Sequence, residues 1–384
     1  MKTLNAKRLQ KTLEMHADEN IARHNMGGAA MLVSQHGVCV CSVYRGYKNV
    51  VTQEPLVPRT MFRLASMTKP VTGIACLLGL QNGWFTLDDK VSDHLPAYEN
   101  MYVGKLDDCG FPVRSHKAQK DILIKHLLTH SSGIISEDAF GNIQNDLIPT
   151  GALSSLTDVV QYCPEHTCLS FEPGEKTAYS GYAAFDTLAR IIEMKSGQTY
   201  ATFVQENIFQ PLGIKDITFV PNDEQWSRMS VMCDKAVGGF VTVDLGRHTF
   251  EQFPLSYTCA GASLVGTIED YHIFAEMLLQ NGSYNGKTIV APELIRLMKT
   301  PYVADGTPGL SKTESWGLGV RVTMCDPILP AGTFGWSGAY GTHFWVDQEN
   351  DISAVFMKNT RWHDSHGHGE TGLQFERDVM STLQ

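Results

Sequence analysis

The stretch from Ser66 to Leu80 constrains the possible folds more than any other part of the sequence. Its apolar residues fall nearly all round a helix, and a helix of this kind is expected to lie buried in a core. Asn82–Gly83 follows as a helix stop. The helix begins with the tetrad S-M-T-K, which places the hydroxyl of Ser66 and the ammonium of Lys69 one turn apart on the same side.

This pair of side chains is suited to nucleophilic catalysis. A serine hydroxyl is a weak nucleophile until a neighbouring group takes its proton, and a partly buried lysine near a hydroxyl can help to do so. The backbone N–H of Ser66, near a helix N-terminus, is also oriented toward a developing oxyanion. Taken alone, S-x-x-K is a weak signal, and the alternative is a helix cap followed by a surface lysine.

The other expected elements place strands at both ends of the chain and helices in the middle. Strands are expected at Gly28–Ser34, Gly37–Arg45, Trp316–Thr323, Gly341–Asp347 and Ile352–Lys358, and helices within residues 1–26 and at Ile122–His130, Gly181–Ser196 and Thr267–Asn281. Residues 97–120, 136–155 and 222–258 look like long loops that shape a pocket. This order indicates one α/β domain with a helical domain inserted into it.

Charge and cysteine content exclude several classes of protein. Lys and Arg total 31 against 41 Asp and Glu, and the net charge of −10 argues against a nucleic-acid binder. The 9 cysteines contain no C-x-x-C pair, so they indicate core residues in a reducing cytosol rather than a disulfide framework. No apolar run approaches the length of a membrane span, and the first 26 residues lack the apolar segment of a secretory signal. We therefore expect a soluble cytoplasmic protein.

Five segments, in their order along the chain, carry a family resemblance. They are FRLASMTKPVTG (62–73), IKHLLTHSSGI (124–134), FEPGEKTAYSGY (171–182), AGASLVGTIEDYHIFAEMLLQNG (260–282) and GWSGAYGTHFWVD (335–347). Together they resemble the serine β-lactamase and penicillin-binding-protein superfamily, and more narrowly its class C β-lactamase-related branch, which includes the family VIII carboxylesterases. The resemblance implies a β-lactamase/transpeptidase-like α/β (α+β) fold, in which helices flank an antiparallel sheet. It divides the chain into residues 1–87 with 262–384 and a helical insert at 88–261.

The resemblance also implies roles for individual residues. Ser66 matches the acylated serine, Lys69 its partner, and Tyr179 the tyrosine that relays protons in this branch. The backbone N–H groups of Ser66 and Ala339 match the oxyanion hole. The residues expected to contact substrate are Gly181, Trp336, Ser337, Gly338 and His343.

Two departures from the family pattern bear on the substrate. The third motif usually opens with a lysine that binds a substrate carboxylate, and here Trp336 stands in that place. The second motif usually ends in asparagine, and here it ends in Gly181. Both differences favour small uncharged esters, so a carboxylesterase acting through an acyl-enzyme is the leading expectation. A β-lactamase or D-alanyl-peptide hydrolase, an acyltransferase and a non-catalytic binding protein remain as alternatives.

The remaining candidate residues are histidines. His363, His366 and His368 lie close enough in sequence to bind a metal, but a polar C-terminal loop is the simpler interpretation. His126 and His130 lack the glutamate of a zinc-protease motif and are interpreted as structural. We therefore expect no metal and no cofactor. The expected partner is a small-molecule substrate, without nucleic acid or membrane, and the sequence sets no oligomeric state.

Overall fold

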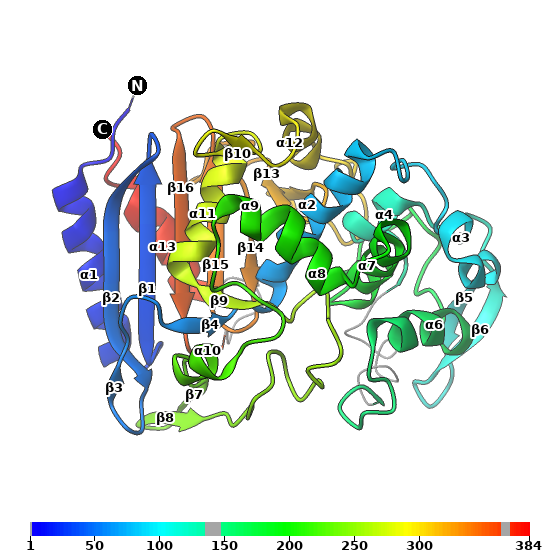
Figure 1. Ribbon diagram of the computed structural model, residues 1–384, viewed down its shortest axis with the longest axis horizontal. Helices are drawn as coiled ribbons and strands as arrows, with labels where there is room; N and C mark the ends of the chain where they lie inside the picture. Colours follow the sequence, from blue (N-terminus) through cyan, green and yellow to red (C-terminus); the bar gives the residue numbers. More distant parts are fainter. Residues whose placement is uncertain (1, 135–146, 362–368) are drawn as a thin grey trace.

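An eight-stranded antiparallel sheet forms one side of the molecule (Figure 1). The computed structural model describes residues 2–134, 147–361 and 369–384. The strand order is β12-β13-β14-β15-β16-β1-β2-β3. In chain order these strands are β1 (Gly28–Gln35), β2 (Val38–Asn49), β3 (Glu54–Pro55), β12 (Glu314–Trp316), β13 (Arg321–Thr323), β14 (Phe334–Gly338), β15 (Thr342–Asp347) and β16 (Ile352–Lys358). The predicted antiparallel fold class is confirmed.

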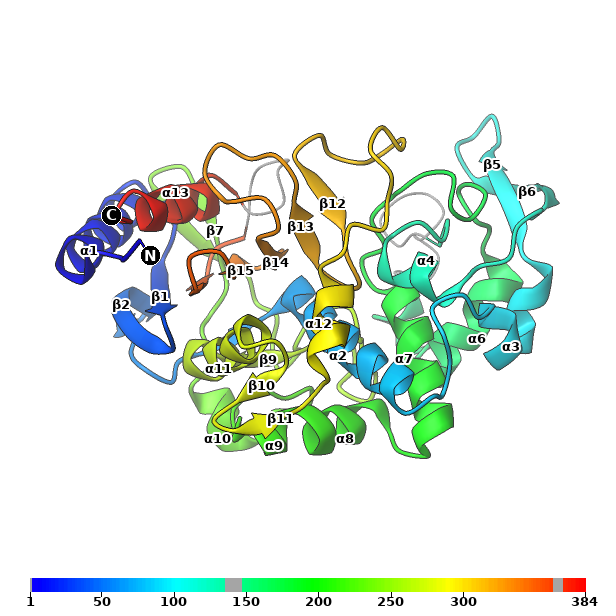
Figure 2. The same cartoon turned by 90° about the horizontal axis from the view of Figure 1, so that it is seen from above.

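Helices cover both faces of this sheet. On one face lie α1 (Ala6–Ala22) and α13 (Gly369–Met380), and on the other lie α2 (Thr68–Gln81) and α11 (Ile268–Leu279) (Figure 2). Leu9 and Leu13 of α1 are fully buried, in agreement with the apolar face expected from their spacing. Two hydrophobic cores result, a large one that contains α2 and a smaller one between the sheet and α1 with α13.

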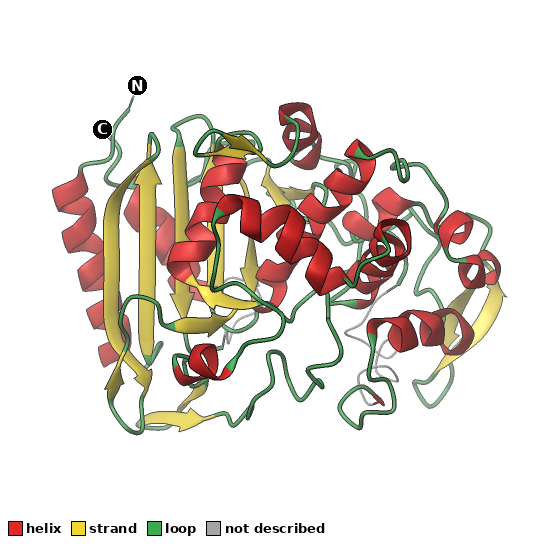
Figure 3. Cartoon of the chain, viewed as in Figure 1, coloured by secondary structure: helices red, strands yellow, loops and turns green. Residues whose placement is uncertain are grey.

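The middle of the chain is mainly helical, and its helices up to residue 196 lie away from the sheet (Figure 3). It contains α3 (Val91–His94), η2 (Pro96–Asn100), α4 (Ile124–Leu128), α6 (Leu156–His166), α7 (Ala183–Ser196), α8 (Tyr200–Val204), η3 (Gln205–Phe209), α9 (Gln210–Leu212) and α10 (Asp223–Ser227). Further along the chain come β10 (Ser283–Tyr284), β11 (Lys287–Thr288) and α12 (Pro292–Met298). The domain boundaries at residues 88 and 261 stay a prediction.

Three sequence-based expectations about local structure are wrong. Residues 97–120 contain the hairpin of β5 (Tyr102–Leu106) and β6 (Pro112–Lys117), and residues 222–258 contain the hairpin of β7 (Cys233–Ala236) and β8 (Gly239–Thr242). Most of these hairpin residues are exposed, so they lack the apolar alternation by which strands are recognised. The single strand expected at Trp316–Thr323 is two strands, β12 and β13, joined by a turn at Gly319 with φ of 74°.

All nine cysteines are free, and six of them are buried. Across residues 2–134, 147–361 and 369–384, no helix has the length and apolar character needed to cross a membrane.

Candidate active site

Ser66 lies where a short strand turns into the buried helix. The strand β4 (Met61–Arg63) pairs with β9 (Val265–Thr267), and the 3-10 turn η1 (Ala65–Met67) joins it to α2. Ala65 has a φ of 46°, in the left-handed region that non-glycine residues seldom occupy. Strained backbone of this kind persists where the surrounding structure holds it, often at functional sites. The hydroxyl of Ser66 is thereby presented at the first turn, as the sequence predicts.

Lys69 is fully buried one turn further along. Its Nζ donates hydrogen bonds to Ser66 Oγ at 3.1 Å, to the carbonyl of Gly261 at 3.0 Å and to the carbonyl of Gly181. An ammonium has three N–H donors, and these three oxygens match them. The interpretation as a surface lysine is therefore wrong, because the helix carries Lys69 into the core beside Ser66.

Tyr179 approaches Ser66 from the segment before α7. Its hydroxyl donates a hydrogen bond to Ser66 Oγ at 2.6 Å. Lys69 Nζ lies 4.8 Å from the centroid of the Tyr179 ring, a cation–π distance. The structure thus brings together Ser66, Lys69 and Tyr179, the three residues expected to act together.

The third motif lies on β14, against the backbone that leads to Ser66. A Cβ at Gly338 would stand 2.2 Å from the carbonyl oxygen of Leu64, so only glycine permits this approach. Thr342 donates to the same carbonyl at 2.9 Å. Ala339 follows Gly338 in the turn between β14 and β15, and it is exposed. Its N–H as an oxyanion donor stays a prediction, and the close packing at Gly338 supports it.

Trp336 faces the site from the same strand. Its ring stacks at 6.2 Å from the ring of Tyr179 and lies 5.3 Å from that of Trp316. Only 4% of Trp336 is exposed. The position that holds a cation in much of the superfamily is here part of a buried aromatic cluster.

Two residues expected to contact substrate, Ser337 and His343, are engaged elsewhere. His343 is buried, and its ring nitrogens lie 2.9 Å from Ser337 Oγ and 2.9 Å from Glu376 Oε1 of α13. Side chains alternate between the faces of a strand, so Ser337 points away from the face that carries Trp336. His343 packs on the α13 side of the sheet, which argues against a place in the pocket wall, and its contact with substrate stays a prediction.

The two histidines of the α4 segment, His126 and His130, have different surroundings. His126 Nδ1 accepts from the N–H of Leu123 and caps α4, so its structural interpretation is supported. The His130 ring lies 4.8 Å from the Tyr179 ring, which places it in the site. Sequence reasoning missed this residue because it interpreted both histidines as structural.

A buried carboxyl beneath Lys69 was also missed. Asp186 of α7 is fully buried, and it accepts from the hydroxyl of Tyr257 and from the N–H of Ala260 at 2.8 Å. Burial raises the pKa of Asp186 to about 7, while these hydrogen bonds and the charge of Lys69 oppose the rise. Asp186 fixes the loop whose next residue, Gly261, accepts from Lys69. A lone aspartate within an apolar helix was the only signal in the sequence.

A hollow of about 590 Å³ lies next to this group of residues. Leu245 and Phe250 line it, and both also pack around Ala65, the neighbour of Ser66. Tyr182, three positions after Tyr179, and the carboxylate of Glu251 complete the part of the wall nearest the site. The hollow therefore combines aromatic surface with charges of both signs, because Asp244 and Arg361 also line it.

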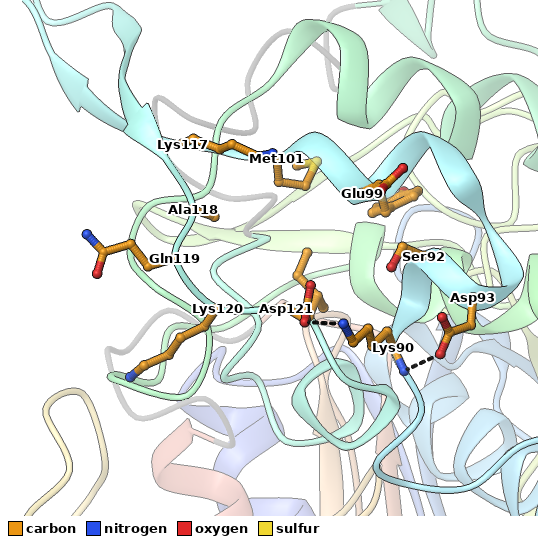
Figure 4. Close-up of a pocket in the computed structure, with 12 residues that line it drawn as sticks. Lys90, Ser92, Asp93, Glu99, Met101, Lys117, Ala118, Gln119, Lys120 and Asp121 are labelled. Carbon is orange, nitrogen blue, oxygen red and sulfur yellow. Dashed lines mark hydrogen bonds and ion pairs between the residues drawn. The ribbon is translucent and has the colours of Figure 1, made fainter.

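A second hollow, of about 460 Å³, belongs to the far end of the helical part (Figure 4). Its polar wall includes Lys90, which pairs with Asp121 at 2.7 Å. It contains none of the residues around Ser66. In the described part of the chain, no three His, Cys, Asp or Glu side chains are placed to hold a metal, and His363, His366 and His368 lie outside the described residues.

Comparison with known proteins agrees with this arrangement. The model of the beta-lactamase family matches residues 11–373. The chain belongs to the beta-lactamase family. It is accordingly a serine hydrolase of the β-lactamase and penicillin-binding-protein superfamily, as the motifs predict.

Individual proteins are similar along nearly the whole chain. Protein Rv1367c of Mycobacterium tuberculosis is 29% identical over 86% of this chain and 85% of its own length. Esterase EstB of Burkholderia gladioli is 26% identical over 95% of this chain and 94% of its own. The structure of EstCE1, described as a hydrolase with promiscuous acyltransferase activity, superposes with a TM-score of 0.82 at 24% identity, over 98% of this chain and 99% of that one.

Proposed function

We propose that this serine hydrolase is a carboxylesterase acting on small esters with uncharged acyl groups. The observation that carries the proposal is that Ser66 Oγ accepts hydrogen bonds from Lys69 and Tyr179, while Trp336 occupies the place of the substrate-binding lysine. The hollow beside the site has aromatic walls that suit an uncharged acyl group, and its charged residues, Asp244, Glu251 and Arg361, include both signs. The similarity to esterase EstB supports the same substrate class.

We propose the following proton path for these residues. Because three oxygens match the three N–H donors of Lys69, its ammonium form is well solvated by the protein. In the resting site the neutral phenol of Tyr179 donates to Ser66 Oγ. After Tyr179 has lost this proton to solvent, its phenolate accepts the proton of Ser66 while Ser66 Oγ attacks the ester carbonyl. The N–H groups of Ser66 and Ala339 hold the oxyanion. As the acyl–oxygen bond breaks, Tyr179 returns its proton to the leaving alcohol.

The second half of the reaction releases the acyl group. Water attacks the acyl-Ser66 carbonyl while Tyr179 takes a proton from that water. The bond between the acyl group and Ser66 Oγ then breaks, and Tyr179 gives the proton to Ser66 Oγ, which restores the hydroxyl. An alcohol in place of water would give a new ester instead of an acid. The acyltransferase activity in the name of EstCE1 makes this transfer the second candidate.

Steady-state kinetics test the proposal. Wild type is expected to hydrolyse short-chain p-nitrophenyl esters much faster than nitrocefin, and Ser66→Ala is expected to lose several orders of magnitude in kcat. A fluorophosphonate probe should label the wild type on Ser66 and leave the variant unlabelled. Near-native ester turnover by Ser66→Ala, or faster turnover of nitrocefin than of esters by the wild type, would contradict the proposal. Product analysis with added alcohols separates hydrolysis from acyl transfer.

A further inference from the structure

His130 accepts two hydrogen bonds from the backbone on either side of Tyr179. The carbonyl of His130 accepts from the N–H of Ala178 at 3.0 Å, and Nδ1 of His130 accepts from the N–H of Ser180 at 3.0 Å. The residues immediately before and after Tyr179 are thus tied to one point on the segment after α4. This arrangement fixes the backbone on both sides of the tyrosine.

The ring of His130 also packs directly on the side chain of Tyr179. Its centroid lies 4.8 Å from that of Tyr179, 4.6 Å from that of Trp316 and 5.5 Å from that of Trp336. Only 1% of His130 is exposed. Backbone and ring together therefore hold Tyr179 in place.

The imidazole must be neutral to accept through Nδ1. A backbone N–H always donates, so the ring proton of His130 resides on Nε2. Burial and the charge of Lys69 hold the pKa of His130 well below its usual value, which keeps this form in place. Nε2 makes no hydrogen bond to the residues that the structure describes, so the contacts that matter come from Nδ1 and from the ring faces.

We infer that His130 is a positioning residue for Tyr179, because its Nδ1 and its carbonyl fix the backbone on both sides of that residue and so hold the phenol against Ser66. The inference rests on the proposed role of Tyr179 in moving the proton of Ser66. His130 does not touch the reacting atoms, and it acts only through Tyr179. Its loss is therefore expected to lower kcat and leave KM nearly unchanged.

Three substitutions separate the acceptor at Nδ1 from the volume of the ring. In His130→Asn, Oδ1 stands at the position of Nδ1, and asparagine tolerates the left-handed φ of 54° at this residue. In His130→Gln, the amide lies one bond further out, at the level of Nε2. His130→Leu fills much of the volume and supplies no acceptor. All three lose ring contacts, so each is expected to lower Tm.

Kinetics and Tm of the three variants give the test. The positioning role predicts that His130→Asn retains at least about ten times the kcat of His130→Leu and of His130→Gln. This ratio should hold even if the Tm of His130→Asn is below the Tm of the other two variants. A tenfold ratio of kcat corresponds to about 1.4 kcal/mol. A role in packing alone predicts that kcat follows Tm. Wild-type kcat in His130→Leu, or equal kcat in the Asn and Leu variants, would overturn the inference while the esterase proposal stands.

Crystal structures of the variants give a readout that needs no substrate. The distance between Tyr179 Oη and Ser66 Oγ, 2.6 Å in the wild type, is expected to persist in His130→Asn and to lengthen in His130→Leu. An unchanged distance in His130→Leu would contradict the inference. If the wild type hydrolyses no ester, the proposed function fails, and these distances still decide whether His130 positions Tyr179.

Discussion

The hydroxyl of Tyr179 lies 2.6 Å from the hydroxyl of Ser66, although 113 positions of sequence separate the two residues. The contact joins the start of the buried helix α2 to the segment before α7. Lys69 also connects these parts of the chain, because its ammonium binds Ser66 and the carbonyls of Gly181 and Gly261. The proposed chemistry therefore depends on how two distant parts of the chain pack.

Tyr179→Phe removes the proposed proton acceptor and keeps the ring. We expect kcat for a p-nitrophenyl ester to fall about 100-fold or more, since general acid–base groups contribute on that scale. The Tm should change little, because the ring contacts remain. Tyr284→Phe, on β10, is the matched control and should retain wild-type kcat. A Tyr179→Phe enzyme with more than half of wild-type kcat would exclude the proposed role.

Gly338→Ala tests the close approach of β14 to the strand before Ser66. The added Cβ would lie 2.2 Å from Leu64 O and 2.3 Å from Thr342 Oγ1, so the strand must move. We expect a loss of about 1–3 kcal/mol in the free energy of unfolding, together with a lower kcat as the Ala339 N–H shifts. Gly239→Ala, where a Cβ meets no atom within 4 Å, is the control. Unchanged stability and kcat in Gly338→Ala would show that the approach is looser than described.

Asp186→Asn tests the buried carboxyl beneath Lys69. The ordinary pKa of 3.8 applies in the unfolded chain, whereas the folded value is about 7. As pH rises from about 4 to about 7, the unfolded state releases this proton and the folded state keeps it, so wild-type stability declines by up to about 1.4 kcal/mol per pH unit. The contribution of the Asp186 carboxyl to the free energy of unfolding is therefore greatest below pH ~4, and it stays at its lowest value above pH ~7.

The asparagine variant cannot ionise and should lack this decline. Denaturant unfolding between pH 4.5 and 7.5 measures the difference in slope between Asp186→Asn and the wild type. Asp305→Asn, at an exposed carboxyl, should reproduce the wild-type slope. Parallel curves for wild type and Asp186→Asn would mean that the Asp186 carboxyl is ionised throughout this range.

Glu376→Ala tests the assignment of His343 to the far face of the sheet. The substitution leaves the buried ring of His343 without the carboxylate at 2.9 Å. A buried ring nitrogen left without its hydrogen-bond partner costs about 1–3 kcal/mol, so the denaturation midpoint should fall clearly. The KM for esters should stay within about twofold, because the pair does not face the site. Glu370→Ala, exposed on the same helix, should change neither quantity. A large rise in KM for Glu376→Ala would indicate that His343 does line the substrate pocket.

The sequence predicted the parts of the site that depend on local spacing. Ser66 and Lys69 share one helical turn, so their contact follows from helix geometry alone. Tyr179 was found through family resemblance, since nothing local connects it to Ser66. Gly261 contributes a carbonyl, which every residue possesses, so its role leaves no mark in the sequence.

The expectations that the structure does not support share a physical origin in tertiary packing. Whether Ser337 and His343 face the substrate depends on which side of the sheet α13 covers, and the sequence analysis did not predict that helix. His130 acts through one ring nitrogen and one carbonyl on a segment that is remote in sequence. The hairpin β5–β6 was missed because its residues are largely exposed, so burial leaves no alternating pattern there.

The pairing of β1 with β16 sets the order in which this enzyme can become active on the ribosome. Ala29 pairs with Lys358, so the middle of the sheet closes only after residue 358 has been translated. Ser66 and Lys69 are synthesised early, yet β14 and its glycine contact reach them only after residue 338. Until then the nascent N-terminal hairpin has an open edge, and such edges invite pairing with other chains. Chaperone occupancy during synthesis would protect this edge.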